Sequence, residues 1–269
     1  MRILVTGAAG FIGYHLCQKL LADGHDVWGL DALTDYYDPA LKRTRLRLLQ
    51  QLDGFQFGQV DLTDAPGLKA FVSDTHAEVV FHLAAQPGVR YSIENPHSYI
   101  LSNVVGTANL LEALRDQPPR HLVFASTSSI YGGNAQTPYA ETHRADSPLS
   151  LYAATKKSGE ALVHSYAHLW SIPSTCVRFF TVYGPYGRPD MALLKFAGAI
   201  ASNEAIDVYG DGRMQRDFTY VEDLVETLAA IMLRIPVAGQ TVHGDSLSAV
   251  APFRLLNIGG GRRVELMDF

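Results

Sequence analysis

The chain has 269 residues, of which 47% are hydrophobic and 18% charged, a globular composition that excludes fibrous and disordered classes. Its 22 basic and 27 acidic residues leave a net charge of -5, which disfavours binding to DNA or RNA, and no apolar run has the ~18 residues of a membrane span. The two cysteines, Cys17 and Cys176, lie far apart in sequence, so we expect buried thiols in the reducing cytoplasm rather than a disulfide framework.

Short apolar runs alternate with longer helical patterns through the first half of the chain. The apolar runs predict strands at residues 3–6, 26–30, 55–60, 79–83 and 121–125. The helical patterns lie between them, at residues 11–21, 39–52, 67–73 and 99–114. Because the strands are almost wholly apolar and helices separate them, they predict a parallel sheet covered on both faces, which is a Rossmann-like, doubly wound α/β fold.

Glycine and proline punctuate the chain from about residue 178 onward, and the alternation of strands and helices breaks there. The elements predicted beyond it are helices at 191–201 and 221–233, a polar loop at 236–252, a short strand at 255–258 and the first turn of a helix at 264–269. We expect the second of these helices to return to the main sheet.

A glycine-rich turn directly follows the first predicted strand and opens the first helix. Gly7, Gly10 and Gly13 have the spacing G-x-x-G-x-x-G. Without side chains there, the backbone can approach a pyrophosphate, and the helix N-terminus offers free N–H groups and the positive end of its dipole. An ordinary turn with glycines for packing is the alternative, and the placement between strand and helix favours a dinucleotide site.

Asp31 ends the second predicted strand, where a carboxylate can accept hydrogen bonds from the adenosine ribose. The same charge repels a 2′-phosphate, so Asp31 favours NAD over NADP; a surface aspartate that caps the next segment is the alternative. Further cofactor candidates are Phe11, Ile12, Asp61, Leu62, Leu83, Ala84, Ala85, Gln86 and Ala125, in the glycine turn and near the strand ends.

Tyr152 and Lys156 form a Tyr-x-x-x-Lys pair, one helical turn apart on one face. The pattern alone often arises by chance. A neighbouring ammonium lowers the pKa of a tyrosine, so a phenolate becomes available as a base near neutral pH. Thr127 belongs to a run of hydroxyl residues after the fifth strand, and we expect it to meet Tyr152 at the same edge of the sheet. Together with the glycine turn and Asp31, these residues predict a nicotinamide-dependent site.

Seven segments, 5–13, 35–38, 82–91, 150–157, 178–185, 187–192 and 214–220, resemble the extended short-chain dehydrogenase/reductase family of nucleotide-sugar enzymes. The resemblance covers essentially the whole chain. Segments 187–192 and 214–220 are similar to the UDP-glucuronate 4-epimerase subgroup in particular. Two departures stand out. Ala32 replaces the usual asparagine beside the adenosine ribose, and the family normally continues well past Phe269.

The resemblance implies a division of the chain into two parts. Residues 1–177, with 217–235 returning to them, would form an NAD-binding Rossmann domain. Residues 178–216 and 236–269 would form a smaller nucleotide-sugar-binding region that is truncated at its C-terminus.

The resemblance also implies a role for each matching residue. Tyr152 would take the proton of the 4-hydroxyl, Lys156 would tune it and hold the nicotinamide ribose, and Thr127 would hydrogen-bond the reacting oxygen. Asn103 would lie near the active-site helix on the cofactor side. Residues implied to bind the substrate are Arg216 at the UDP pyrophosphate, Arg188 and Arg90 at the sugar, and Thr181, Lys195, Val208, Tyr209 and Arg213 along the pocket. For each arginine, a surface salt bridge is the alternative.

The implied activity is NAD-dependent 4-epimerisation of a UDP-hexuronic acid, by transient oxidation at C4, in a cytoplasmic homodimer. A UDP-galactose-type 4-epimerase and a non-catalytic NAD-binding regulator are the alternatives. A 4,6-dehydratase is disfavoured because that chemistry needs an Asp-Glu pair where Ser128 and Ser129 stand. Related decarboxylases resemble this site but carry a glutamate at the position of Ser129. We therefore expect Thr127, Ser128 and Arg188 to hold the substrate carboxylate and to suppress loss of CO2, with Ser129 as a further substrate-binding residue. Serines that only cap the end of the strand are the alternative.

Other patterns are given structural roles. His164 and His168 have the spacing of metal ligands on a helix, but no third ligand accompanies them, so we predict no metal site. His82 lies in an apolar strand and is expected in the core. The basic run at residues 42–47 is expected to form a solvated helix face.

Overall fold

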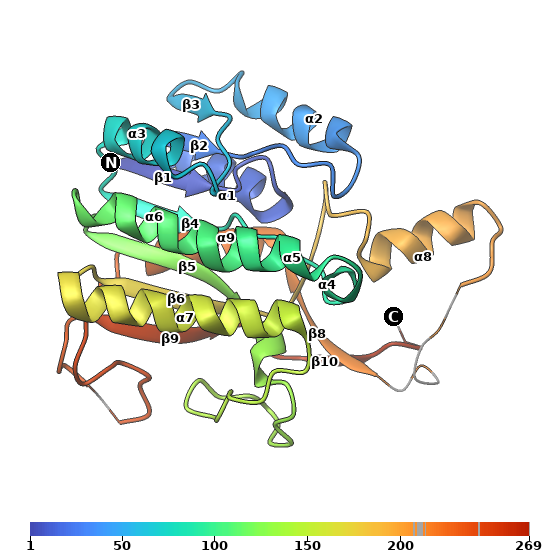
Figure 1. Cartoon of the computed structure of the whole chain (residues 1–269). Helices are drawn as coiled ribbons and strands as arrows, with labels where there is room; N and C mark the ends of the chain where they lie inside the picture. Colours follow the sequence, from blue (N-terminus) through green and yellow to red (C-terminus); the bar gives the residue numbers. More distant parts are fainter. Residues whose placement is uncertain (207, 209–211, 213, 242, 269) are drawn as a thin grey trace.

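The computed structural model describes residues 1–206, 208, 212, 214–241 and 243–268 (Figure 1). Within these residues, the central sheet has seven parallel strands in the order β3-β2-β1-β4-β5-β6-β9. Its strands are β1 (Arg2–Thr6), β2 (Asp26–Leu30), β3 (Phe55–Gly58), β4 (Val79–His82), β5 (His121–Thr127), β6 (Ser174–Phe179) and β9 (Phe253–Ile258). Successive strands are added on one side of β1 up to β3 and on its other side from β4 onward, so the strand order switches between β1 and β4. At such a switch point, doubly wound folds open a crevice for ligands.

Helices cover both faces of this sheet. One face carries α1 (Phe11–Ala22), α2 (Pro39–Leu49) and α9 (Val221–Ile231), and the other carries α3 (Ala65–Thr75), α6 (Gly106–Arg115) and α7 (Leu151–Trp170). Alternate side chains of a strand enter opposite cores: Ile3 packs under α1, and Leu4 packs on the other face. The predicted doubly wound α/β fold is confirmed.

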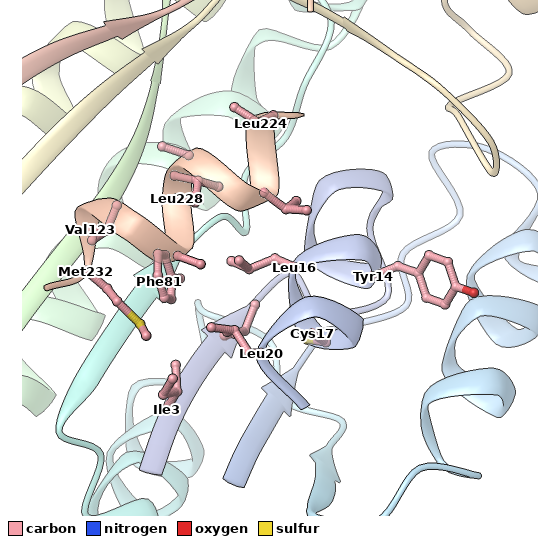
Figure 2. Packing of buried hydrophobic residues seen from close by; sticks show 14 of the residues in the cluster. Ile3, Tyr14, Leu16, Cys17, Leu20, Phe81, Val123, Leu224, Leu228 and Met232 are labelled. Atoms are coloured by element: carbon pink, nitrogen blue, oxygen red, sulfur yellow. The ribbon is translucent and has the colours of Figure 1, made fainter. Parts of the chain in front are cut away.

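Helix α9 returns to the central sheet from the far end of the chain. Figure 2 shows Leu224 and Leu228 of α9 beside Leu16 and Leu20 of α1, and all four side chains are fully buried. The predicted return of this helix is therefore confirmed, and α1, which begins at the glycine turn, packs on the sheet beside α9.

The predicted helix at 99–114 is divided between a π-helical turn and α6, and two short helices precede it. The helical region as a whole therefore has four short pieces. They are α4 (Tyr91–Glu94), α5 (Pro96–Tyr99), the π-helical η1 (Ile100–Val105) and α6. Sequence periodicity located the helical region but not the wider π turn, within which the Asn103 side chain hydrogen-bonds Gln86 and Thr155.

A small second sheet lies beyond β6. It has the order β10-β8-β7 and contains β7 (Thr181–Tyr183), β8 (Gln215–Tyr220) and β10 (Arg263–Glu265). The helical turn predicted at 264–269 is wrong over its described residues, because Val264 pairs with Arg216 of β8 in an antiparallel ladder. A local pattern cannot show a partner about fifty residues away.

Two further differences concern the second half of the chain. Strands β6, β7 and β8 were not predicted as elements. Strand β9 lies beside β6 in the central sheet, although the predicted division assigns residues 236–269 to the smaller region. Helix α8 (Ala192–Ala201) has no buried residue and projects from the body of the molecule (Figure 1). Among the described helices, none is long and apolar enough to cross a membrane.

Candidate active site

A cleft with an empty volume of about 1390 Å³, including its open mouth, lies along the carboxyl edge of the central sheet. Asn103 is the one predicted cofactor residue that does not line it. The others all do: Gly7, Gly10, Phe11, Ile12, Gly13, Asp31, Asp61, Leu62, Leu83, Ala84, Ala85, Gln86, Ala125, Tyr152 and Lys156. The strand ends thus bring residues from four separate βα turns to one site.

The glycine turn has room for a phosphate group but none for side chains. Gly7 has a φ of +75°, in the left-handed region, and a Cβ there would lie 2.8 Å from the backbone nitrogen of Ala84. A Cβ on Gly13 would overlap the carbonyl oxygen of Gly7. Gly10 caps α1 without a side-chain hydrogen bond, so the helix presents its first N–H groups to the cleft. These residues fit the pyrophosphate of a dinucleotide.

Asp31 lines the cleft and is only 8% exposed. Its carboxylate accepts hydrogen bonds from the backbone N–H groups of Ala9 (3.2 Å) and Leu33 (2.8 Å). Burial raises the pKa of Asp31, and the positive charge of Lys42 opposes that rise. Asp31 is therefore not a surface residue, although the hydrogen bond from Leu33 does cap the segment that follows, and its position in the cleft suits an adenosine ribose.

The basic run at 42–47 is not a solvated face, contrary to the prediction. Arg43 and Arg47 are exposed, but Lys42 and Arg45 are buried, and Lys42 lines the cleft. The Lys42 ammonium donates to the backbone oxygen and the hydroxyl of Thr34, both at 2.9 Å. One face of this helix is therefore solvated, and the other carries two buried cations that hydrogen-bond polar partners.

Tyr152, Lys156 and Thr127 line the same cleft as the glycine turn. Helix α7 carries the first two residues, and its start is fixed by Ser150, whose hydroxyl accepts from the N–H of Ala153 at 3.1 Å. Lys156 is 3% exposed, and its ammonium lies 4.3 Å from the centre of the Phe124 ring. Burial lowers the pKa of Lys156 to about 8.

The environment of the Tyr152 phenol differs from the prediction. Burial raises the pKa of Tyr152, and the groups that oppose this rise are the Arg188 guanidinium and the side chain of Thr127. We expected Lys156 to supply the opposing charge. Arg188 lines the cleft as well, and its positive charge favours the phenolate form of Tyr152. The role of Lys156 toward Tyr152 stays a prediction.

Arg188 has a defined orientation in the cleft wall. Its Nε and Nη2 atoms donate to the two oxygens of Asp190, at 3.0 and 2.6 Å. The same carboxylate accepts from the hydroxyl of Tyr36 at 3.0 Å. Tyr36 also lines the cleft, and sequence reasoning gave it no role although it lies in segment 35–38. Asp190 uses one edge of the guanidinium, which leaves the Nη1 side for a second anion.

A buried ion pair supports the catalytic residues from behind. Arg178 of β6 donates to both oxygens of Glu160 of α7, at 2.9 and 3.0 Å, and both side chains are almost fully buried. The hydroxyl of Ser126 donates to the same Glu160 carboxylate at 2.7 Å. This network fixes α7 against the end of β5, and so fixes Lys156 relative to Thr127. Glu160 was missed, although it follows Lys156 by one helical turn.

Asn103 is a linking residue outside the cleft wall. Its side-chain oxygen accepts from the N–H of Gln86 at 2.7 Å. Its amide donates to the backbone oxygen of Gln86 and to the hydroxyl of Thr155, both at 3.1 Å. It therefore ties the turn after β4 to the catalytic helix.

The predicted substrate residues are dispersed. Ser128 and Ser129 are half-buried directly after Thr127, and the N–H of Ser129 donates to the Thr127 hydroxyl at 3.2 Å. Thr181 lines a smaller adjacent pocket together with Arg188. Exposed positions away from the cleft wall are occupied by Arg90, Lys195, Val208 and Arg216. Tyr209 and Arg213 lie outside the described residues.

The histidines singled out in the sequence have structural partners. His82 is 1% exposed and is held between the hydroxyls of Thr6 and Thr107, at 2.8 and 3.1 Å, as expected for a core residue. His164 and His168 bond to Ser248 and to the backbone oxygen of Val250. Within the described part of the chain, there is no group of three or more residues that could ligate a metal.

The fold and the cleft define a class: short-chain dehydrogenase/reductase-like proteins that hold a dinucleotide at the carboxyl edge of a parallel sheet, beside a Tyr–Lys pair. Residues 3–242 match the NAD dependent epimerase/dehydratase family, and the chain belongs to that family.

Three relatives show how far the similarity extends. A probable UDP-glucuronate 4-epimerase of Rhizobium meliloti (strain 1021) is 52% identical over 273 residues, covering 100% of this chain and 80% of the relative. UDP-glucuronate 4-epimerase 3 of Arabidopsis thaliana is 44% identical, covering 99% of this chain and 62% of the relative. The crystal structure of UDP-glucuronic acid 4-epimerase from Bacillus cereus, in complex with UDP-glucuronic acid and NAD, is 36% identical with a TM-score of 0.86, covering 100% of this chain and 80% of that chain.

Proposed function

We propose that this chain catalyses the NAD-dependent 4-epimerisation of a UDP-hexuronic acid, interconverting UDP-glucuronate and UDP-galacturonate. The observation that carries the proposal is that Thr127, Tyr152 and Lys156 line the same cleft as the glycine turn and Asp31. The similarity to a UDP-glucuronic acid 4-epimerase solved with its substrate and NAD supports the choice of sugar.

Three parts of the cleft would hold three polar parts of NAD. The turn from Gly7 to Gly13 fits the pyrophosphate, Asp31 the adenosine ribose and Lys156 the nicotinamide ribose. Bound NAD supplies a reversible hydride acceptor for C4 of the sugar. The carboxylate of Asp31 would repel the 2′-phosphate of NADP, so we propose NAD as the cofactor.

Tyr152 acts as the base in this proposal. Its phenolate takes the proton of the 4-hydroxyl as the C4–H bond breaks, and the C4–O bond becomes a ketone. Arg188 stabilises the phenolate, and Thr127 donates a hydrogen bond to the reacting oxygen. The 4-keto sugar then rotates in the site so that it presents its other face. Hydride returns to that face of C4, and Tyr152 gives the proton back to O4.

The substrate carboxylate presents a second problem. A 4-keto glucuronate is a β-keto acid, which loses CO2 once the carboxylate bond aligns with the ketone π system. Thr127, Ser128 and Ser129 offer hydroxyl donors. Asp190 accepts from Nε and Nη2 of Arg188, so the Nη1 atom of Arg188 can donate to a second anion. We propose that these groups hold the carboxylate out of alignment. The other substrate residues, Arg90, Thr181, Lys195, Val208, Tyr209, Arg213 and Arg216, stay predictions.

Two alternatives remain from the sequence. A UDP-galactose-type 4-epimerase would act on neutral sugars, and Arg188 in the cleft disfavours it because a neutral hexose offers no anion to this cation. A non-catalytic NAD-binding regulator would not need Tyr152, Lys156 and Thr127 together in the cleft.

The proposed assembly is a cytoplasmic homodimer. Ile100, Leu101 and Val105 of η1 are 40%, 38% and 39% exposed, which is unusual for adjacent aliphatic side chains on one helix. Pairing of the 99–114 region and α7 with those of a second copy would cover them. Both cysteines are buried and unpaired, which suits a reducing compartment. Light scattering tests the assembly: a mass near one 29.4 kDa chain would reject the dimer.

Incubation of the NAD-loaded protein with UDP-glucuronate tests the activity. Parallel reactions contain UDP-glucose, and products are separated by anion exchange and identified by mass spectrometry and NMR. We expect UDP-galacturonate with at most traces of a UDP-pentose, and little conversion of UDP-glucose. Conversion of UDP-glucose alone would favour the neutral-sugar epimerase, and NAD binding without any conversion would favour the regulator.

A further inference from the structure

Arg45 carries a positive charge in a fully buried position (0% exposed), and the proposed chemistry gives it no part. Its acceptors are carbonyl oxygens and a phenol rather than a carboxylate. Nη1 donates to the backbone oxygen of Ala9 at 3.0 Å and to the hydroxyl of Tyr37 at 2.8 Å. Nε and Nη2 donate to the backbone oxygen of Tyr186 at 3.2 and 2.6 Å, and Nη2 also reaches that of Gly187 at 3.3 Å.

These contacts join three parts of the chain that are distant in sequence. Ala9 belongs to the glycine turn, and Tyr37 to the connection that leads into α2. Tyr186 and Gly187 belong to residues 183–190, which we call the clasp segment. In Figure 1 the gold chain that leads into α8 reaches up to the blue chain before α2, and the Arg45 hydrogen bonds lie at this meeting point.

Two further contacts fasten the clasp segment to the cofactor side. The His15 ring of α1 hydrogen-bonds the backbone oxygen of Pro185 at 2.9 Å. The rings of Tyr14 and Tyr186 meet edge to face, with centroids 5.2 Å apart. The clasp segment is thus bound to α1 and α2, the two helices that flank the glycine turn.

Both ends of the clasp segment belong to the dinucleotide cleft. Val182, directly before it, lines the cleft, and so does Arg188 within it. The middle of the segment, at Tyr186, is the part that Arg45 holds. The chain therefore leaves the cleft wall, is fastened beside the glycine turn and returns to the wall next to Tyr152.

We propose that Arg45 is a positioning residue that fastens the clasp segment to the glycine turn and thereby slows dissociation of the nicotinamide dinucleotide between catalytic cycles. The inference rests on the proposed function, because a 4-epimerase ends each cycle with its cofactor in the starting redox state and has no need to release it. Slow release keeps such an enzyme loaded.

The type of residue at position 45 follows from the geometry. The three nitrogens of the guanidinium together make five contacts, which matches its five N–H donors. A buried cation is tolerated only when its donors are satisfied. A lysine has the charge but not the planar fork, so it cannot reach the carbonyls of Ala9 and Tyr186 together.

Release of NAD from the loaded protein tests the proposal. The wild type is compared with Arg45→Met, Arg45→Lys, His15→Phe and, as a matched control on the exposed side of the same helix, Arg47→Met. Free NAD is removed by gel filtration, and the bound nucleotide is quantified over time. We expect both Arg45 variants to release NAD at least about tenfold faster, since each loses charge-assisted hydrogen bonds. His15→Phe should release it faster by a smaller factor, and Arg47→Met should match the wild type.

Hydrogen exchange of the same proteins provides the second readout. Amides of the clasp segment should exchange faster in the Arg45 variants, while those of the central sheet stay protected. Wild-type release rates in Arg45→Lys would overturn the proposal, because they would show that charge alone suffices. Unchanged release despite a loosened clasp segment would also overturn it. A wild-type chain that binds no NAD would overturn the proposed function as well, whereas unchanged release from loaded variants would overturn the inference alone.

Discussion

The two sides of the cleft are built differently. The cofactor side is made of strand ends and turns, and the predicted cofactor residues other than Asn103 all line it. The substrate side depends on β7, β8 and α8, and of its predicted residues that the structure describes, only Thr127 and Arg188 line the main cleft. A dinucleotide site is therefore set by the topology of one sheet, whereas a sugar site depends on how separate elements pack.

Burial shows the same contrast. Strands β1, β4 and β5, which lead to the cofactor side, are almost fully buried, and β5 has no exposed residue along its length. Helix α8 has no buried residue at all. A rigid cofactor side can hold NAD and the base in fixed geometry, and we expect substitutions there to have larger effects than substitutions on α8.

The largest expected effect comes from the base. Tyr152→Phe should lower turnover at least about 1,000-fold, because no other group can take the 4-hydroxyl proton, while NAD stays bound. Turnover and bound NAD are measured on the same preparation. Tyr139→Phe, whose ring stacks on Tyr131, is the control and should stay active. Substantial activity in Tyr152→Phe would show that the base is misassigned.

A pair of glycine substitutions compares the two sides directly. Gly13→Ala should weaken NAD binding by about 100-fold or more, because its Cβ would meet the carbonyl oxygen of Gly7 in a close-packed turn. Gly198→Ala on α8 adds a methyl group with no atom within 4 Å and should leave NAD binding unchanged. Calorimetry measures both. Equal effects would erase the contrast between the two sides.

Asp31 sets the choice of cofactor. We expect the wild type to bind NAD at least about tenfold more tightly than NADP, or ~1.4 kcal/mol, because the carboxylate repels a 2′-phosphate. In Asp31→Asn the preference should shrink, since the repulsion is gone and Lys42 remains in the cleft wall. Titration calorimetry with both nucleotides gives the ratio, and equal affinities in the wild type would refute the assignment.

A last expected effect concerns the free energy of unfolding in acid. Burial lowers the pKa of His82 from 6.5 to about 3, so the unfolded chain binds more protons than the folded chain between these values. The contribution of His82 to the free energy of unfolding is therefore fully present above pH 6.5. It is lost as the pH falls toward 3, by up to about 1.4 kcal/mol per pH unit. Urea unfolding across this range measures the loss. His82→Gln, which keeps polar contacts without titrating, should show a shallower slope; an identical slope would exclude His82 as a source.

The residues of the cofactor side could be predicted from the sequence better than the rest of the molecule. The glycine turn, Asp31 and the Tyr–Lys pair could be predicted because each lies at the end of a strand or on a single helix, where short-range spacing fixes its place. The π turn at Asn103 and strand β10 could not, because each makes its contacts with partners far along the chain: Gln86 and Thr155 for the first, and β8 for the second.

Lys42 and Arg45 illustrate the limit most clearly. A run of basic residues on a helix usually lies in solvent, and the sequence gives no sign that two of them turn inward. Their acceptors are Thr34, Ala9 and the clasp segment, which only tertiary packing brings together. Likewise, no pattern in the sequence indicated that the charge of Arg188 acts on Tyr152.

The most direct test of the central claim uses UDP-glucuronate deuterated at C4. If one cleft removes hydride and returns it to the same carbon, the NAD-loaded protein will yield UDP-galacturonate that keeps its deuterium at C4, with at most traces of a UDP-pentose. Mass spectrometry and NMR locate the label. Loss of the deuterium to solvent, or a pentose as the main product, would contradict the account.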